Sequence, residues 1–385
     1  MGKLPAPLAR AREGSGSAAL ALERGFGSSP PFSVGAEEEL LLVDRETHGL
    51  VHEAPAVADA ISLPSNLVHT ELYAACLELA TPVCGQAGEA AESLARLRAC
   101  VRAAGATPIG VGLHPSARPG DAEMLAEDER YRYIARLLGS AALRTPECAL
   151  HVHIGLPDPD TAVGVLNGLR PYLAMLTALA ANSPFLDGHD SGFASVRGIQ
   201  MRRYPRFEIP RAFADFHDYV GALDAVMGAA AVDDYTLIWW QLRLHPRLGT
   251  VEVRVMDSQS SLSSVAALVA LIHGLAARAV EAGELPDAGA GTVAESCYQA
   301  IRFGLDAQLW DGHRVRPARE LIREAVELAR PYAAEVGSDE QLNQVERILV
   351  DGNGADRQRA AFRAGGIAGL LRFLVDEGAV APSVG

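Results

Sequence analysis

The chain has 385 residues, of which 49% are hydrophobic and 21% charged, and it carries a formal net charge of −14 at pH 7. This length and apolar content exclude an intrinsically disordered protein, and the acidic balance argues against a general binder of nucleic acid or anionic membranes. Lys3 is the only lysine, so a P-loop lysine and a Schiff-base lysine are excluded from the folded body, and any phosphate chemistry must use arginine, backbone amides and metal ions.

The first segment of the chain, residues 1–31, has the composition of a tail. Its short Ala/Leu stretch is closely flanked by charged residues, and it ends in a Ser-Ser-Pro-Pro run, so we expect a mobile tail and not a signal peptide. No apolar run reaches membrane-spanning length, and the five cysteines form no CxxC pair, which fits a reducing compartment. We therefore expect a cytoplasmic protein with a single domain over residues 32–385.

Hydrophobic periodicity predicts strands in the first two thirds of the chain and helices after them. The predicted strands are residues 33–44, 71–81, 107–113, 150–156, 237–244 and 250–257. The predicted helices are residues 89–104, 122–138, 161–181, 263–282, 291–304, 316–334, 338–351 and 355–377. This order indicates an α+β fold and not a doubly wound parallel sheet.

The strand predicted over residues 250–257 has two unlike faces. Val251, Val253 and Val255 share one face, which favours packing on helices, whereas Glu252 and Arg254 share the other. The polar pair either lines a cleft or is solvated on an ordinary amphipathic strand. Taken alone, the segment fits both interpretations.

Acidic residues gather at the start of the strand predicted over residues 33–44. Glu37 and Glu39 share one face and Glu38 lies on the other. Two like charges on neighbouring positions of one face repel each other unless water or a cation separates them. Hard divalent cations with oxygen ligands, above all Mg²⁺, are the usual solution.

Two further predicted strands carry groups of the same kind. Glu78 lies between two leucines, where a lone carboxylate is costly without a partner, and His151 and His153 share one face of a short strand. Each segment has an ordinary structural explanation, but four strands that each present Glu or His favour a sheet face around a carboxylate-rich metal cleft. Zinc is less well supported, because there is no HExxH motif and no Cys/His cluster.

Residues 182–206 are predicted to form a long polar loop that is rich in arginine, including Arg197 and Arg203. Loops of this length inside a compact protein tend to be functional. Planar bidentate binding of phosphate or carboxylate explains an arginine-dense loop in an acidic protein, and pairing with the protein's own acidic surface is the alternative. Residues 289–294 match a GxGxxA pattern but follow no strand, so a dinucleotide site is not expected.

These segments resemble glutamate–cysteine ligase family 2, the carboxylate–amine ligase type. The resemblance is carried, in the family's order, by residues 35–39, 77–81, 150–155, 183–188, 193–197 and 249–257, and it spans about residues 32 to 380. It implies a glutamine-synthetase-like catalytic fold, in which an antiparallel sheet holds ATP and Mg²⁺ on its concave face and helices pack on its convex face. It also implies ATP-dependent amide or peptide bond formation through an acyl phosphate, including glutamate–cysteine ligase activity, with small-molecule or peptide substrates and a homodimer.

The resemblance also implies roles for individual residues. The implied metal ligands are Glu37, Glu39, Glu78, His151 and Glu252. Arg254 would contact the transferring phosphoryl group, and Arg197 would bind phosphate or a substrate carboxylate. Glu71 would face the amine substrate, and Arg203 an anionic substrate group. The extra acid Glu38 departs from the family pattern; it would either lie at the rim of the cleft or change which pair binds metal.

Two other functions remain open from the sequence. One is a metal-dependent amide hydrolase, or another ATP-independent enzyme, on the same scaffold. The other is a non-catalytic binder of a nucleotide or metabolite, which is disfavoured because binding alone does not need so costly a cluster of like charges. Release of ADP that requires both a carboxylate and an amine separates the ligase from the hydrolase.

Overall fold

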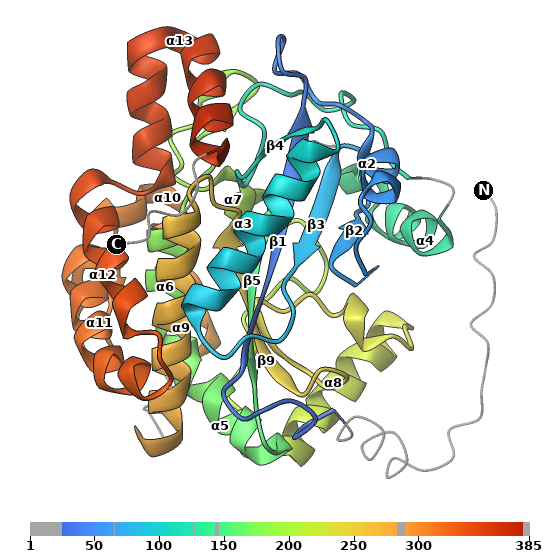
Figure 1. Cartoon of the computed structure of the whole chain (residues 1–385). Helices are drawn as coiled ribbons and strands as arrows, with labels where there is room; N and C mark the ends of the chain where they lie inside the picture. Colours follow the sequence, from blue (N-terminus) through green and yellow to red (C-terminus); the bar gives the residue numbers. More distant parts are fainter. Residues whose placement is uncertain (1–24, 65, 126–127, 143–145, 283–288, 380–385) are drawn as a thin grey trace.

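The computed structural model describes residues 25–64, 66–125, 128–142, 146–282 and 289–379 (Figure 1). Its centre is a seven-stranded sheet in which every pairing is antiparallel. In spatial order its strands are β2 (Val68–Thr70), β3 (Cys76–Ala80), β1 (Val34–Val43), β5 (Ala149–Gly155), β9 (Thr250–Asp257) and β8 (Leu242–His245), and β4 (Thr107–Ile109) also pairs with β1. Two small hairpins lie outside it: β6 (Phe185–Leu186) with β7 (His189–Asp190), and β10 (Gln308–Trp310) with β11 (Val315–Pro317).

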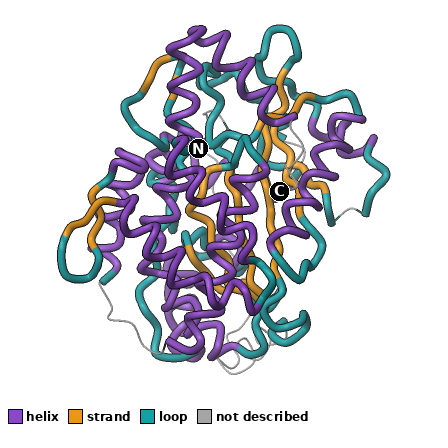
Figure 2. The backbone as a smooth tube through the Cα atoms, turned by 60° about the vertical axis from the view of Figure 1, so that its left-hand side comes forward, coloured by secondary structure: helices purple, strands orange, loops and turns teal. Residues whose placement is uncertain are grey.

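Helices cover one face of this sheet in two layers (Figures 1 and 2). The inner layer consists of α3 (Ala87–Ala103), α5 (Pro159–Leu169), α6 (Leu173–Ala180) and α9 (Leu262–Ala282). Outside it pack α10 (Ala290–Phe303), α11 (Ala318–Glu335) and α12 (Asp339–Asp351), and α13 (Gly354–Ala379) follows. The other helices are α2 (Ala54–Ala60), α4 (Glu129–Leu138), α7 (Val196–Met201) and α8 (Phe216–Ala230). The prediction of an α+β fold with an antiparallel sheet is confirmed.

Alternation along the strands sets what the helices cover. The even-numbered residues Leu40 and Leu42 of β1, and the valines of β9 such as Val251 and Val253, are buried in one large hydrophobic cluster with the inner helices. This cluster draws residues from Val34 to Leu349. On the opposite face, Leu41 and Val43 at the end of β1 pack in a second hydrophobic cluster. Glu37 and Glu39 lie on this same face, nearer the start of the strand.

Several predicted elements differ from the structure. The helix predicted over residues 161–181 is two helices separated by a 3-10 turn at Arg170–Tyr172, because Pro171 lacks the N–H that a continuous α-helix needs. The helix predicted from residue 122 begins at Glu129, where Asp128 caps it. The predicted strand 71–81 is a strand only from Cys76, and the predicted loop 182–206 contains the β6–β7 hairpin and α7. No element was predicted for α2 or α8.

The prediction that no apolar run reaches membrane-spanning length is wrong: two helical stretches, Pro159–Ala180 and Leu262–Glu281, are long and apolar enough to cross a membrane by length and composition. In each, 78% of the most apolar window is buried inside the protein, against the sheet and the outer helices. They are accounted for as core helices.

Part of the predicted tail belongs to the described structure. Gly27 N–H donates to Leu156 O at 3.0 Å, and Phe26 contacts Phe216 edge-on with ring centroids 5.9 Å apart. Residues 25–31 therefore lie against the folded body, whereas residues 1–24 are outside the described residues.

Candidate active site

The strand register brings the predicted acidic and imidazole groups onto one face. Residues directly opposite each other in an antiparallel ladder share a face and lie close together. The paired residues are Glu39 with Glu78, Glu37 with His151, His153 with Glu252, and Glu252 with Arg243. Four neighbouring strands and β8 thus line up their polar side chains on the face opposite the inner helices.

These side chains form three overlapping groups, and within each group the possible ligand atoms lie within 4.8 Å of one another. The groups are Glu37, His153 and Glu252; Glu37, Glu78 and His151; and Glu39, Glu71 and Glu78. All five predicted metal ligands are therefore brought together. Glu71, predicted to face the amine, lies in the turn before β3, among the same carboxylates.

Two arginines hold Glu252 ionised. Arg243 Nε donates to Glu252 Oε2 at 2.6 Å, and Arg254 Nη1 donates to Glu252 Oε1. Glu252 is fully buried, which opposes its ionisation, but these guanidinium groups outweigh burial and keep its pKa well below the usual value. Arg254 in turn keeps an Nε atom that is buried and has no hydrogen-bond partner among the described residues.

Glu78 and Glu71 lack comparable compensation. Burial and the neighbouring carboxylates raise the pKa of Glu78 well above its usual value, and burial and then Glu39 raise the pKa of Glu71 to about 8. Crowded carboxylates that disfavour one another's charge are the donor set that a hard divalent cation fits. The residues present therefore suit Mg²⁺.

The two histidines of β5 differ in their partners. His151 Nδ1 lies 3.4 Å from Glu37 Oε2, whereas His153 Nδ1 lies 2.9 Å from Thr250 Oγ1. Burial and then Arg254 lower the pKa of His151; for His153, Glu37 and Glu252 outweigh burial and raise it. In the described structure the Nε2 atom of His151 is buried without a hydrogen-bond partner, whereas the Nε2 atom of His153 lies 3.4 Å from Glu37 Oε1. His153 was not predicted as a site residue, although its alternation with His151 was the signal for it.

Glu38 takes no part in the cleft, so both roles considered for it were wrong. It is fully buried on the helical face, where Arg98 Nε donates to its Oε1 at 2.7 Å and Arg98 Nη2 to its Oε2 at 2.6 Å. Arg98 also donates to the carbonyl oxygens of Gln259 and Ser260. The departure from the family pattern is thus a buried ion pair between β1 and α3.

The predicted loop 182–206 is fixed to the end of β9 by Asp257. Its Oδ2 accepts from Asn182 N at 2.9 Å and Ser183 Oγ at 2.7 Å, and its Oδ1 accepts from Ser195 Oγ at 2.8 Å. Arg197 follows at the start of α7, buried, with Nη1 3.7 Å from the same carboxylate. Its Nε has no hydrogen-bond partner among the described residues, so one edge of the guanidinium is available to a ligand.

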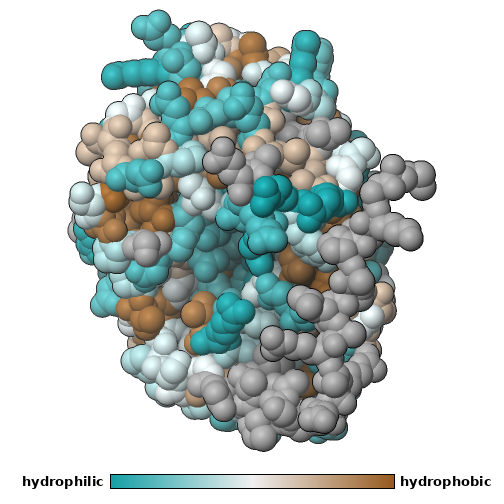
Figure 3. Space-filling model, turned by 90° about the vertical axis from the view of Figure 1, so that its right-hand side faces the viewer, coloured by the Kyte–Doolittle hydropathy of each residue, from teal (hydrophilic) through white to brown (hydrophobic). Residues whose placement is uncertain are grey.

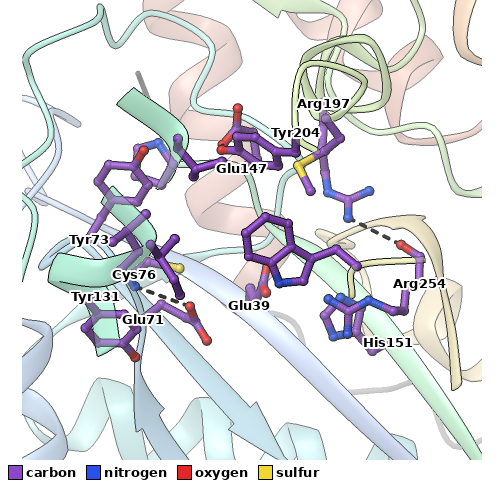
Figure 4. Close-up of a pocket in the computed structure, with 16 residues that line it drawn as sticks. Glu39, Glu71, Tyr73, Cys76, Tyr131, Glu147, His151, Arg197, Tyr204 and Arg254 are labelled. Atoms are coloured by element: carbon purple, nitrogen blue, oxygen red, sulfur yellow. Dashed lines mark hydrogen bonds between the residues drawn. The ribbon is translucent and has the colours of Figure 1, made fainter. Parts of the chain in front are cut away.

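The polar face opens into a cavity of about 150 Å³. Figure 3 shows a hydrophilic hollow on the side of the molecule that lies to the right in Figure 1. Glu39, Glu71, His151, Arg197 and Arg254 line one part of the cavity (Figure 4). The remaining lining is aromatic and apolar and was not predicted: Leu72, Tyr73, Cys76, Tyr131, Ile134, Leu138, Pro146, Met201, Tyr204 and Trp239, together with Glu147.

Arg203 is the predicted site residue that does not reach the cavity. Its side chain is exposed, and it does not line the cavity. The other eight predicted residues lie in the clusters or line the cavity.

Comparison with known proteins gives one family. The model of glutamate–cysteine ligase family 2 matches residues 33–377. Two proteins of Rubrobacter xylanophilus, provisionally named glutamate–cysteine ligase 2-1 and 2-3, are each 37% identical to this chain, over 358 and 365 residues. The matches cover 90% and 92% of this chain and 94% and 99% of the relatives.

Solved structures share the fold at low sequence identity. A glutamate–cysteine ligase from Francisella tularensis in complex with AMP has a TM-score of 0.67 at 12% identity, over 93% of this chain and 91% of that chain. A bifunctional glutathione synthetase from Pasteurella multocida has a TM-score of 0.65 at 16% identity, over 94% of this chain and 53% of that chain. At these identities the likeness concerns the fold alone.

Proposed function

The chain belongs to glutamate–cysteine ligase family 2 and is a carboxylate–amine ligase, and we propose that it uses ATP and Mg²⁺ and forms its amide bond through an acyl phosphate. The observation that carries this proposal is the joining of three carboxylate and imidazole clusters to a cavity that Arg254 and Arg197 also line. A triphosphate and a carboxylate repel each other, and this arrangement supplies the positive charge that lets them approach.

The proposed reaction has two steps. First, an oxygen of the substrate carboxylate bonds to the γ-phosphorus of ATP while the bond from that phosphorus to the bridging oxygen breaks, and ADP leaves. Then the amine nitrogen bonds to the acyl carbon, the acyl–phosphate C–O bond breaks, phosphate leaves, and the surplus amine proton passes to solvent. The amine adds to an activated carbonyl, so a free carboxylate never has to act as an electrophile.

The chain's own residues have separate tasks in these steps. Arg254, oriented by Glu252, directs its guanidinium toward the transferring phosphoryl oxygens, and Arg197 neutralises a phosphate or a substrate carboxylate. Glu37, Glu39, Glu78, His151 and Glu252 would hold Mg²⁺, and Glu71 and His153 adjoin the same clusters. Bound there, Mg²⁺ would neutralise phosphate charge.

The test is release of ADP and phosphate by the full chain with ATP, Mg²⁺ and pairs of acids and amines, beginning with L-glutamate and L-cysteine because the relatives carry those substrates in their names. We expect release that requires both partners. Glu252→Gln should abolish it, whereas Glu340→Gln, at an exposed position of α12, is the matched control and should not. Unchanged release by Glu252→Gln would contradict the assignment of the metal site.

The same assay decides between the ligase and the amide hydrolase. Amide hydrolysis without nucleotide would favour the hydrolase on this scaffold. We also propose a cytoplasmic location; the five cysteines, which are free thiols in the structure, fit a reducing compartment. A homodimer stays a prediction.

A further inference from the structure

Helix α4 has an apolar stripe that faces the cavity. Tyr131, Ile134 and Leu138 recur at the spacing of one helix face, and all three line the cavity. All three side chains are half-buried, and the helix contains no fully buried residue. An amphipathic helix normally buries its apolar face against other elements, so a ligand that fills the cavity would complete the burial of this stripe.

Polar contacts hold α4 in this orientation. Arg130 Nη1 donates to Asp234 Oδ2 at 2.9 Å and Nη2 to Thr236 Oγ1 at 3.0 Å, and the Tyr131 hydroxyl donates to Thr70 O. These bonds tie the first turn of the helix to β2 and to the segment before β8. The stripe is therefore held toward the cavity.

Aromatic side chains form the opposite wall. Trp239 lies 6.0 Å from Tyr204 between ring centroids, and the Arg206 guanidinium stacks over Trp239 at 5.4 Å. Aromatic residues make up 6% of the chain, yet four of them line this one cavity: Tyr73, Tyr131, Tyr204 and Trp239. A cavity of about 150 Å³ matches the size that accommodates a benzene ring in a protein interior.

Two opposite charges complete the lining. Arg197 presents a guanidinium whose Nε has no hydrogen-bond partner in the described structure, and Glu147 presents a carboxylate whose Oε2 accepts from the Tyr204 hydroxyl at 2.8 Å. Figure 4 shows both at the edge of the cavity, near the aromatic wall. A guanidinium suits a carboxylate and a carboxylate suits an ammonium, so the pair matches a zwitterionic amino acid.

We propose that this cavity binds the amine substrate, and that this substrate is an α-amino acid with a branched apolar or aromatic side chain. The inference rests on the proposed ligase function for the reaction, but its binding part can be tested separately. Ile134, Leu138 and Trp239 determine specificity by enclosing the side chain. A small side chain such as that of alanine or cysteine leaves the α4 stripe uncovered and forgoes that burial.

The test is calorimetric titration of the full chain, with Mg²⁺ and a non-hydrolysable ATP analogue, by L-alanine, L-cysteine, L-leucine and L-phenylalanine. We expect leucine and phenylalanine to bind at least tenfold more tightly than alanine, because added apolar contact in a specificity pocket typically raises affinity by this much. Leu138→Trp fills the cavity and should bring the phenylalanine-to-alanine affinity ratio close to one. Leu328→Trp, at an exposed leucine of α11, is the matched control and should keep the ratio.

Affinity that does not rise with side-chain size would overturn the inference, as would an equal ratio in the two tryptophan variants. ADP release separates this failure from a failure of the proposed function. If bulky amino acids bind but never support ADP release with any acid, the binding inference stands and the ligase proposal fails. If ADP release is supported by small amines alone, the ligase proposal stands and the inference fails.

Discussion

The two faces of the central sheet bury the same kinds of side chain, glutamate and histidine, but differ in whether these side chains have hydrogen-bond partners inside the protein. On the helical face, both carboxylate oxygens of Glu38 accept from Arg98, and His273 of α9 uses both ring nitrogens, at 2.9 Å from Ser338 Oγ and 2.7 Å from Phe32 O. On the cleft face, the Nε2 atom of His151 has no hydrogen-bond partner in the described structure, and the carboxylates of Glu39, Glu71 and Glu78 crowd one another.

The difference separates residues that serve the fold from residues kept for a ligand. A buried charge whose partners are inside the protein belongs to a structural ion pair. Removing one partner leaves the other buried and unpaired, which destabilises the fold. Buried carboxylates that lie close together raise one another's pKa, as those around Glu78 and Glu71 do. Ionising them destabilises the fold unless a cation is bound among them. Glu37, Glu38 and Glu39 are consecutive, so the direction of each side chain decides to which class it belongs.

The largest expected effect is on the helical face. Glu38→Gln leaves the Arg98 guanidinium buried without its carboxylate, and we expect a loss of about 3–5 kcal/mol in the free energy of unfolding. Urea denaturation of the variant beside Glu340→Gln measures it. The double variant Glu38→Leu with Arg98→Met should recover most of the loss, because it removes both charges. A loss below about 1 kcal/mol in Glu38→Gln would contradict the assignment of this pair to the fold.

The matching change on the cleft face should have the opposite signature. Glu78→Gln removes one of the crowded carboxylates, so we expect ADP formation to fall by about 10²–10³-fold while stability without Mg²⁺ is retained or increased. Wild-type protein should gain thermal stability on addition of Mg²⁺, and the variant should gain less. Destabilisation of Glu78→Gln as severe as that of Glu38→Gln would show that the two faces do not differ in this way.

The alternation of residues along the strands was enough to predict which acids share a face. Glu37, Glu39 and Glu78 were assigned correctly to one side because the strand period is two. The strand period does not predict which residue of another element pairs with each buried acid. Arg98 lies 60 residues after Glu38 in a helix, so the pairing depends on how α3 crosses β1, which no local pattern encodes.

Turns and helix ends were the other source of error. Glu71 was placed in a strand, but the chain turns between residues 71 and 75, and this turn brings its carboxylate among those of Glu39 and Glu78. The aromatic wall of the cavity was missed because Tyr131, Tyr204 and Trp239 come from three separate segments that meet only in the folded protein. The α4 stripe was visible as a helical pattern, but its incomplete burial beside a cavity was not.

His273, whose two ring nitrogens both have hydrogen-bond partners on the helical face, leads us to predict a pH dependence of stability. Burial outweighs the hydrogen bond to Phe32 and lowers the pKa of His273 to about 4, against about 6.5 in the unfolded chain. The unfolded state therefore takes up a proton first as the pH falls, and stability is lost between about pH 6.5 and pH 4, by about 3 kcal/mol at most. Urea denaturation of wild type and His273→Gln across this range should show a difference in unfolding free energy that shrinks toward low pH; a constant difference would contradict the prediction.

The smallest expected effect concerns Arg197 and Arg203, two arginines of one segment that were both predicted to bind an anionic group. Arg197 is buried beside Asp257 and lines the cavity, whereas Arg203 is exposed and does not. Surface substitutions away from specific contacts change free energies by about 0.5 kcal/mol or less, so Arg203→Ala should alter the rate of ADP release by about twofold at most. Arg197→Ala, which removes a buried charge from the cavity, should lower it by about 10²-fold or more. If Arg203→Ala matched that loss, the exposed end of the segment would have to reach the substrate during turnover, and the division between cleft residues and surface residues would have to be redrawn there.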